Sequence, residues 1–415
     1  MARARHRDRA ATRTGILARV TSHRSIALLA LFFLACGGDD DDRAPDAALV
    51  DSGTDAGPLP EPAADYFVAG PHVVASTRVT LVDDAREGRA LPVEIWYPAV
   101  ESARDAAAAG HAMAEFETGT RATELARLVS EAPPACLRAR TRSARDAEPL
   151  ADTARWPFVV FSHCHVCTRF DVAEVSERLA SFGIAVVAPD HEGNTLWDEL
   201  EGDAAPVGAE FLEVRVADVR FVLDAMLEDT NDALPDALRG RFDAARAGVM
   251  GHSFGAATAG VAAARDPRFV AAMAIAAPIT ALGGGVRAAD VSTPFLFLLA
   301  REDNSITEVG NRLIRGDHSR LSGPSWLVEV DDAGHWSFSD HCGLIDLFDA
   351  GCGTGTRQTM SGVEFNYLDN STARDIAADV AASFFARWLL GDEGATTLLA
   401  RQHDSGAVTV SARVP

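Results

Sequence analysis

From residue 73 onward, short apolar runs alternate with longer amphipathic segments. Two β-branched runs at 73–83 and 91–99 are separated by the polar residues 84–88, which predicts an antiparallel pair of strands joined by a turn. Six later runs are continuously apolar, as is typical of strands buried on both faces of a sheet: 156–163, 183–190, 246–253, 270–278, 293–300 and 325–335. The amphipathic pattern predicts helices over 171–182, 211–228, 254–265 and 372–390.

This alternation predicts the fold class. Repeated strand–helix units form a mainly parallel sheet with helices on both faces, so we expect an α/β domain. Residues 101–155 are rich in Ala and Arg at helical spacing, and we expect them to form an inserted helical segment. No internal repeat is present, and one folded domain is predicted over 64–415.

The N-terminal region has a different pattern. Seven Arg precede the apolar run 26–34, which is too short to span a hydrocarbon core that needs about 20 residues. A basic start, a short apolar run and a small residue at the cut are typical of an export signal, here residues 1–35. Cys36 after Leu34-Ala35 resembles a bacterial lipobox, although Phe33 stands where Leu is usual. The resemblance implies that Cys36 is lipidated; the alternative is an ordinary secretory signal with a chance cysteine.

Residues 36–63 are rich in Asp, Ala, Gly and Pro and have almost nothing to bury. We expect a disordered, self-repelling tether between the lipid anchor and the domain. These expectations place the protein in the bacterial cell envelope, exported and attached to a membrane only through its anchor.

Composition excludes several kinds of chemistry. The chain carries a net charge of −22, and all 38 basic residues are Arg. A Walker-A lysine, a cofactor Schiff base and a Ser–Lys dyad all need an amine that the chain lacks. An acidic chain is also a poor electrostatic partner for nucleic acid.

Residues 251–255 read Gly-His-Ser-Phe-Gly, directly after an apolar run and before a helix rich in small residues. A serine on a sharp strand-to-helix turn needs small neighbours two residues away, because strand and helix approach closely there. The turn lifts the hydroxyl above the sheet edge and aims the helix N-terminus at a developing oxyanion. Ser253 is therefore predicted to be a nucleophile.

The strand, the Gly-His-Ser-Phe-Gly turn and the helix together resemble the α/β-hydrolases. The similarity extends from about Tyr66 to the C-terminus, and it points to the branch with platelet-activating-factor acetylhydrolases and dienelactone-hydrolase-like esterases. The segments that carry it are Leu91–Pro98, Val159–His163, Leu179–Asp190 and Arg215–Asp224. It implies an α/β-hydrolase fold and a serine hydrolase that cleaves carboxylic esters through an acyl-enzyme, with no metal or organic cofactor. Dienelactone hydrolases proper use a cysteine nucleophile, which Ser253 replaces.

In this superfamily the serine, the acid and the histidine follow one another along the chain. Asp303 follows the run at 293–300 and His335 follows the next predicted strand, so both match the family pattern by position. The acetylhydrolases take the acid from the preceding strand, but residues 276–278 contain no carboxylate. The alternatives are Glu302, Asp331 and Asp332 for the acid, and His163, His191 and His341 for the base.

The resemblance implies an oxyanion hole made by two backbone N–H groups. One belongs to Phe254, and the other, by position, to His165 in the loop after the strand at 156–163. Cys164 stands where the family usually has glycine, which puts the geometry of the hole in question unless a disulfide holds the loop.

Cys164 and Cys167 also form a C-x-x-C motif, a pattern shared with zinc and redox sites. Crowded ligands at one strand end cannot converge tetrahedrally, so we favour structural disulfides in an oxidising compartment. Cys342 could pair with Cys352, and Cys136 could pair with Cys164 or Cys167. The sequence does not choose among these pairings.

We expect the substrate to be a small-molecule or lipid ester. Candidate pocket walls are His191, Trp197, Trp336 and Phe161. The alternatives are a phospholipase A2 or acetylhydrolase-like lipase, a cutinase-like polyester hydrolase, an acyltransferase or peptidase, and an inactive binding lipoprotein. The sequence gives no oligomeric state.

Overall fold

The computed structural model describes residues 60–151, 154–400 and 407–414. The predicted signal at 1–35, Cys36 and most of the tether at 36–63 lie outside the described residues. No helix within the described ranges is both long enough and apolar enough to cross a membrane.

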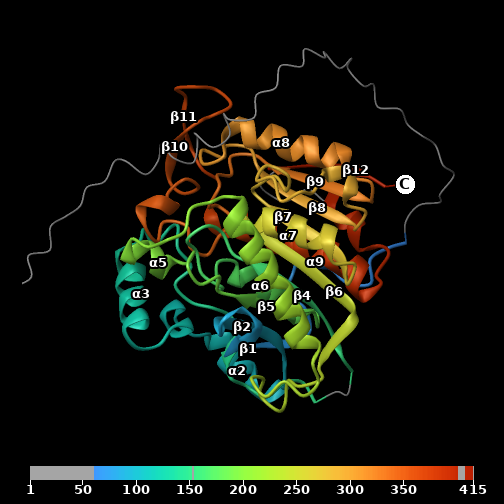
Figure 1. Ribbon diagram of the computed structural model, residues 1–415. Coiled ribbons are helices and arrows are strands. Elements are labelled where there is room, and N and C mark those ends of the chain that lie inside the picture. Colours follow the sequence, from blue (N-terminus) through green and yellow to red (C-terminus); the bar gives the residue numbers. More distant parts are fainter. Residues whose placement is uncertain (1–59, 152–153, 401–406, 415) are drawn as a thin grey trace, which may run out of the picture. The chain divides into compact units, whose positions relative to one another are not determined.

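A ten-stranded sheet forms the centre of the folded part, in the order β12-β9-β8-β7-β6-β4-β5-β2-β1-β3 (Figure 1). Its middle is parallel and consists of β4 (Trp156–Ser162), β5 (Ala185–Pro189), β6 (Phe242–His252), β7 (Phe269–Ile275), β8 (Phe295–Ala300) and β9 (Ser325–Val330). The prediction of a mainly parallel sheet is confirmed.

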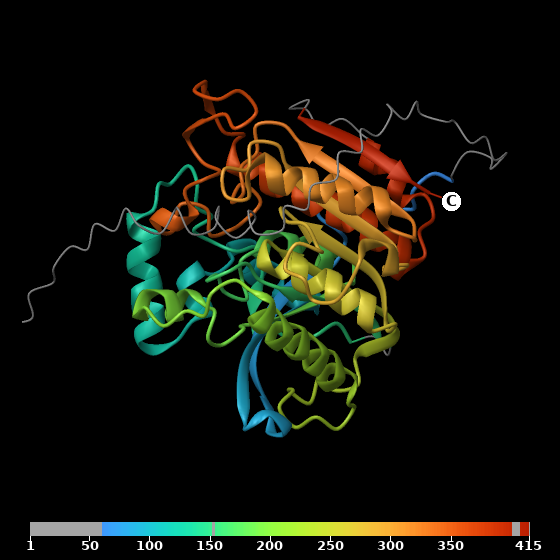
Figure 2. The same ribbon diagram turned by 45° about the horizontal axis from the view of Figure 1, so that its top comes forward.

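Antiparallel strands extend the sheet on both sides. β1 (Val73–Asp83) and β2 (Arg89–Ala99) pair along their whole length, and β2 joins β5. β12 (Val408–Arg413) pairs with β9 at the other edge, and the short β3 (Ala144–Arg145) lies parallel to β1. Figure 2 shows the β1–β2 hairpin in blue and β12 in red at opposite ends of the sheet.

Helices cover both faces of the sheet. α4 (Ala173–Ser181) and α9 (Asn370–Phe385), with a π-helical turn at Ala386–Leu390, pack on one face. α6 (Ala209–Leu227), α7 (Phe254–Arg265) and α8 (Thr307–Arg320) pack on the other. In β4, Val159 and Phe161 point into the first core, whereas Phe158 and Val160 point into the second. Such strands are apolar at every position because both faces are covered.

Three features differ from the predicted elements. The sequence analysis missed α8, whose polar sequence buries few apolar side chains, and β12, a short edge strand with mostly exposed residues. In the insertion, α2 (Arg104–Ala109) and α3 (Gly119–Glu131) are helical, but the described residues from 132 to 155 contain no helix. Two prolines directly after α3 stop it, because proline cannot donate the backbone hydrogen bond that a helix needs.

Short elements complete the described chain. They are α5 (Leu196–Glu201), the hairpin of β10 (Thr354–Thr356) and β11 (Glu364–Asn366), and the 3₁₀ turns Asp84–Arg86, Glu101–Ala103, Met113–Phe116, Ala288–Asp290, Asp346–Phe348 and Ala395–Ala400.

A long-range disulfide ties the insertion to the loop that follows β9. Cys136 pairs with Cys352, 216 residues away, and Cys342 is a buried free thiol. The possible pairings of Cys342 with Cys352 and of Cys136 with Cys164 or Cys167 are therefore wrong. Sequence spacing could not choose the partner, because the chain brings residues 136 and 352 together only in the folded state.

Candidate active site

The predicted nucleophile occupies a single-residue turn between β6 and α7. Ser253 has φ 55° and ψ −117°, in the positive-φ region that non-glycine residues rarely adopt. A Cβ on Gly251 would lie 1.9 Å from the carbonyl oxygen of Gly255, and a Cβ on Gly255 would lie 1.9 Å from that of Ser162. Both glycines are therefore required for the turn. Ser253 is largely buried, and 8% of its surface remains exposed.

The structure brings Ser253, His335 and Asp303 together from the ends of three strands. Ser253 Oγ lies 2.8 Å from His335 Nε2, and His335 Nδ1 lies 2.7 Å from Asp303 Oδ2. The other oxygen of Asp303 accepts the backbone N–H groups of Ser305 and Ile306, at 2.9 Å each. The carboxylate is thus held from both sides and fixes the orientation of the imidazole.

The alternative acids point elsewhere. Glu302 accepts hydrogen bonds from Arg357 and from residues 358–359. Asp331 pairs with Arg301 at 2.8 Å, and Asp332 pairs with Arg357 at 2.6 Å. Within the described chain, none of these carboxylates bonds to His335.

The alternative bases are also occupied away from Ser253. His163 Nε2 accepts the N–H of His191 at 2.9 Å, and His341 Nε2 lies 3.1 Å from Thr168 Oγ1. Burial lowers the pKa of His191 and of His341 to about 4, and it lowers the pKa of His163 well below the usual range. These side chains are neutral at pH 7 and contribute to the packing.

The loop after β4 carries the second predicted oxyanion donor. Cys164 and Cys167 form a disulfide across this loop. The disulfide restrains the loop at the position where Cys164 stands in place of the glycine that is usual in the family. The completely buried Arg215 on α6 donates to the carbonyl oxygens of His163 at 2.6 Å and Cys164 at 2.9 Å.

These contacts set the direction of the His165 N–H. In a trans peptide the C=O and the N–H point in opposite directions, so fixing the Cys164 carbonyl on Arg215 turns the His165 N–H away from Arg215. Neither this N–H nor that of Phe254 has an acceptor among the described residues. Both are available to an oxyanion.

Sequence reasoning missed Arg215. Its guanidinium stacks 4.5 Å from the ring centroid of Phe254, and burial lowers its pKa to about 9. A charged residue between Leu212 and Val216, on the face of the helix that is otherwise buried, is the signal that could have identified it.

Two further Asp–His pairs were also missed. His252, inside the Gly-His-Ser-Phe-Gly turn, has Nδ1 2.9 Å from Asp171 Oδ2. His191 has Nδ1 2.9 Å from Asp218 Oδ2 and Nε2 2.8 Å from Ser162 Oγ. Neither Asp171 nor Asp218 follows a strand, so the pattern that identified Asp303 does not mark them.

The predicted pocket walls have different surroundings. Trp336 is 5% exposed and packs its ring 5.0 Å from that of His335, so it borders the site. Trp197 is buried and donates its indole N–H to Glu117 at 3.3 Å, whereas His191 and Phe161 have no exposed surface. The last two therefore do not contact solvent, and His191 is bound instead to Asp218 and Ser162.

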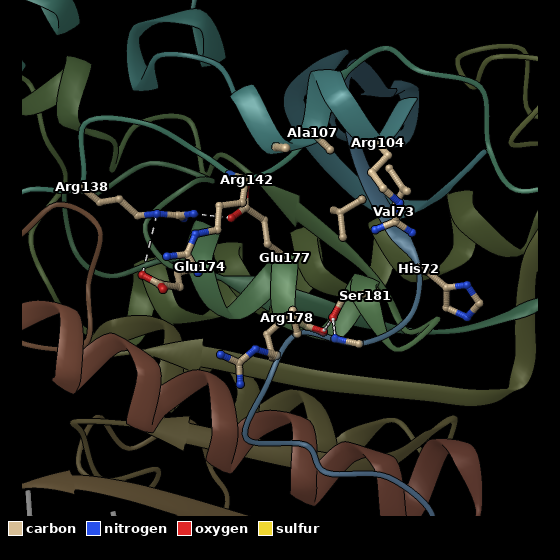
Figure 3. A pocket seen from close by; sticks show the side chains of 14 residues that line it. His72, Val73, Arg104, Ala107, Arg138, Arg142, Glu174, Glu177, Arg178 and Ser181 are labelled. Atoms are coloured by element: carbon tan, nitrogen blue, oxygen red, sulfur yellow. Dashed lines mark hydrogen bonds and ion pairs between the residues drawn. The ribbon is translucent and has the colours of Figure 1, made fainter. Parts of the chain in front are cut away.

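A pocket of about 300 Å³ lies between the start of β1, α2 and α4 (Figure 3). Arginines and glutamates line it, among them Arg138, Arg142, Glu174 and Glu177. Ser253, His335 and Asp303 do not line this pocket.

Asp171 joins two clusters of buried potential metal ligands: Cys164 with Asp171 and His252, and Cys167 with Asp171 and His341. Metal binding by cysteine requires a thiolate, and here both sulfur atoms are joined in the disulfide.

Comparison with known proteins supports the fold that carries this site. Residues 144–322 match the Dienelactone hydrolase family, a range that contains Ser253 and Asp303. A solved structure of a ferulic acid esterase from Streptomyces cinnamoneus superposes with a TM-score of 0.60 at 24% identity, covering 84% of this chain and 98% of that chain. No curated protein matches the chain. The predicted α/β-hydrolase fold is confirmed, and residues 144–322 are similar to the Dienelactone hydrolase family. Both similarities support a carboxylic ester hydrolase.

Proposed function

We propose that the protein hydrolyses carboxylic esters through an acyl-enzyme on Ser253, with His335 as general base and Asp303 as its orienting acid. The observation that carries the proposal is the continuous hydrogen-bonded path from Ser253 Oγ through His335 to Asp303 at a positive-φ strand-to-helix turn. Hydrogen-bond reach between nucleophile, base and orienting acid is the geometric requirement of this chemistry.

Each residue has one role in the reaction. Asp303 accepts the Nδ1–H of His335, which leaves Nε2 free to take the proton of Ser253 as its oxygen attacks the ester carbonyl. The N–H groups of Phe254 and His165 receive the developing oxyanion, and each such donor contributes about 3 kcal/mol in comparable sites. His335 then gives the proton to the leaving alcohol. In the second half of the reaction, His335 takes a proton from water as the water attacks the acyl-enzyme, and it returns the proton to Ser253 as the acid leaves.

The surroundings of Phe254 support an ester with an apolar acyl group. Phe254 belongs to a small hydrophobic cluster, and several of its neighbours are only partly buried: Val207, Phe211, Leu282 and Val286. A partly exposed apolar surface beside the nucleophile offers a contact for an alkyl or aromatic chain. The ferulic acid esterase with the same fold makes hydroxycinnamate esters a reasonable class to test.

The test is hydrolysis by the purified protein of p-nitrophenyl esters from acetate to palmitate, together with ethyl ferulate. We expect turnover of at least one class and loss of turnover in Ser253→Ala. The acyl preference separates a short-chain esterase from a lipase or a feruloyl esterase. An inactive wild type across the whole series, or a fully active Ser253→Ala variant, contradicts the proposal.

We also propose that the protein is an exported lipoprotein anchored through Cys36 in the bacterial cell envelope. The basic start, the short apolar run and the cysteine after Leu34-Ala35 support this location. In a bacterial host, Cys36→Ala should move the protein from the membrane fraction to the soluble fraction. Unchanged membrane association contradicts the anchor.

A further inference from the structure

A second buried imidazole lies directly beside the proposed base. The rings of His252 and His335 have centroids 5.3 Å apart, and neither side chain of the pair His252–Asp171 has exposed surface. His252 Nδ1 lies 2.9 Å from Asp171 Oδ2, and His252 Nε2 lies 3.1 Å from the backbone carbonyl oxygen of His335. Both nitrogens of this ring therefore face oxygen atoms.

The contacts define the protonation of the ring. A backbone carbonyl only accepts, so His252 Nε2 must donate to His335. The Asp171 carboxylate accepts the N–H of Cys164 at 3.3 Å and the hydroxyl of Ser339, which is the pattern of an ionised acid. His252 Nδ1 must then donate as well. A ring with two donating nitrogens is an imidazolium.

Asp171 connects three segments that build the site. Its carboxylate binds His252 in the nucleophile turn and the N–H of Cys164 in the loop that carries His165. Its backbone carbonyl accepts the N–H of Asp340, at 2.7 Å, in the loop that follows His335. Displacing this pair would therefore move the base and the oxyanion loop relative to Ser253.

We propose that the buried Asp171–His252 pair is a positioning device that clamps the backbone of His335 and the loop of His165 in reacting geometry. The inference rests on the proposed Ser253 hydrolysis and adds two residues that do not touch substrate. The groups that face His252 agree with a cationic ring: Asp171 and, farther away, Asp303 raise its pKa against the opposing effect of burial. Among the described residues, the imidazoles of His335 and His341 are the other ionisable groups near His252.

Three substitutions at one position separate positioning from simple packing. His252→Leu removes both donors, His252→Gln keeps an N–H near the position of Nε2, and His252→Asn keeps one near the position of Nδ1. We expect kcat of the Leu and Asn variants to fall about 10- to 100-fold with KM changed less than about threefold, because small displacements of reacting groups act on the chemical step. The Gln variant should recover most of kcat.

The matched control is His341→Leu: His341 is another buried histidine near Asp171, and no hydrogen bond or ring contact joins it to His335 within the described part of the chain. Each rate is divided by the concentration of active sites, measured by labelling with a fluorophosphonate, so that partial unfolding does not count. Wild-type kcat in His252→Leu, or equal kcat in the Gln and Asn variants, overturns the clamp while Ser253→Ala still reports on the hydrolase proposal.

A second measurement does not depend on activity. Nitrogen NMR of histidine-labelled wild-type protein, with the His252 signals assigned from the His252→Gln spectrum, should show both ring nitrogens of His252 protonated at pH 7. A neutral ring at pH 7 overturns the clamp even if every ester tested fails as a substrate.

Discussion

Two Ser–His–Asp arrangements lie within this fold, with nearly identical hydrogen-bond distances. In the first, Ser253 lies 2.8 Å from His335, which lies 2.7 Å from Asp303. In the second, Ser162 lies 2.8 Å from His191, which lies 2.9 Å from Asp218. Measured by these distances alone, the two are the same constellation.

Their surroundings are different. Ser253 occupies a positive-φ turn at the N-terminus of α7 and keeps an exposed surface, whereas Ser162 is the last residue of β4 and has none. Asp218 also accepts Arg86 at 2.7 Å and Arg89 at 2.8 Å, so its charge holds two arginines as well as an imidazole. The backbone turn, access and available oxyanion donors distinguish a nucleophile from a buried polar network.

The serine substitutions should give the largest difference between the two arrangements. Ser253→Ala should reduce kcat by about 10⁴-fold or more, because removing a nucleophile of this kind eliminates the acyl-enzyme route. Ser162→Ala should keep kcat within about tenfold, because the Ser162 hydroxyl has no access to substrate. Steady-state hydrolysis of the best p-nitrophenyl ester measures both, and equal losses would falsify the distinction.

The two aspartates should differ next. Asp303→Asn should lower kcat about 10³- to 10⁴-fold, because an amide in that place favours the wrong tautomer of His335. Asp218→Asn should affect kcat far less when the rate is expressed per active site. Pre-steady-state bursts provide the active-site concentration, and a loss in Asp218→Asn as large as that in Asp303→Asn would mean that the second arrangement takes part in catalysis.

Asp218→Asn should instead have its main effect on stability. Removing the buried carboxylate of Asp218 leaves Arg86 and Arg89 without their partner, which should lower the free energy of unfolding by about 3 kcal/mol. Urea unfolding followed by fluorescence measures the change. The control is Asp229→Asn, which breaks a surface pair with Arg155 and should leave the midpoint unchanged. Identical midpoints for the two variants contradict the structural role of Asp218.

The first arrangement could be predicted from the sequence because each of its members follows an apolar strand. Ser253, Asp303 and His335 lie directly after β6, β8 and β9 or a few residues beyond, and parallel strands bring those ends to one edge of the sheet. The fold was predictable for the same reason: strands buried on both faces are apolar throughout.

The surrounding polar network could not be predicted in this way. Asp171 lay within a predicted helix that begins only at Ala173, and it meets His252 across 81 residues. In the sequence, Arg215 looks like any other polar residue of a helix. Its hydrogen bond to the Cys164 carbonyl oxygen is visible only in the folded structure. Such contacts depend on how separate elements pack, so a local sequence pattern does not predict them.

The smallest effect is a pH dependence of stability that belongs to the second arrangement. Burial and the nearby positive charge of Arg215 lower the pKa of His191 to about 4, against about 6.5 in an unfolded chain. Between those values the unfolded chain binds a proton that folded His191 does not, so the free energy of unfolding falls as the pH falls. The contribution of His191 is complete above about pH 6.5 and is lost as the pH drops through about 4.

Replacing His191 should remove this part of the dependence. The slope that one such group contributes is at most about 1.4 kcal/mol per pH unit, and His191→Gln should reduce the wild-type slope between pH 4.5 and 6.5 by up to that amount. Buried His341, with its pKa also lowered to about 4, keeps its own contribution, so the slope should shrink without vanishing. Urea midpoints at half-unit pH intervals measure it. An unchanged slope would show that His191 titrates normally in the folded protein. The Ser162, His191 and Asp218 side chains would then be accessible to water rather than buried.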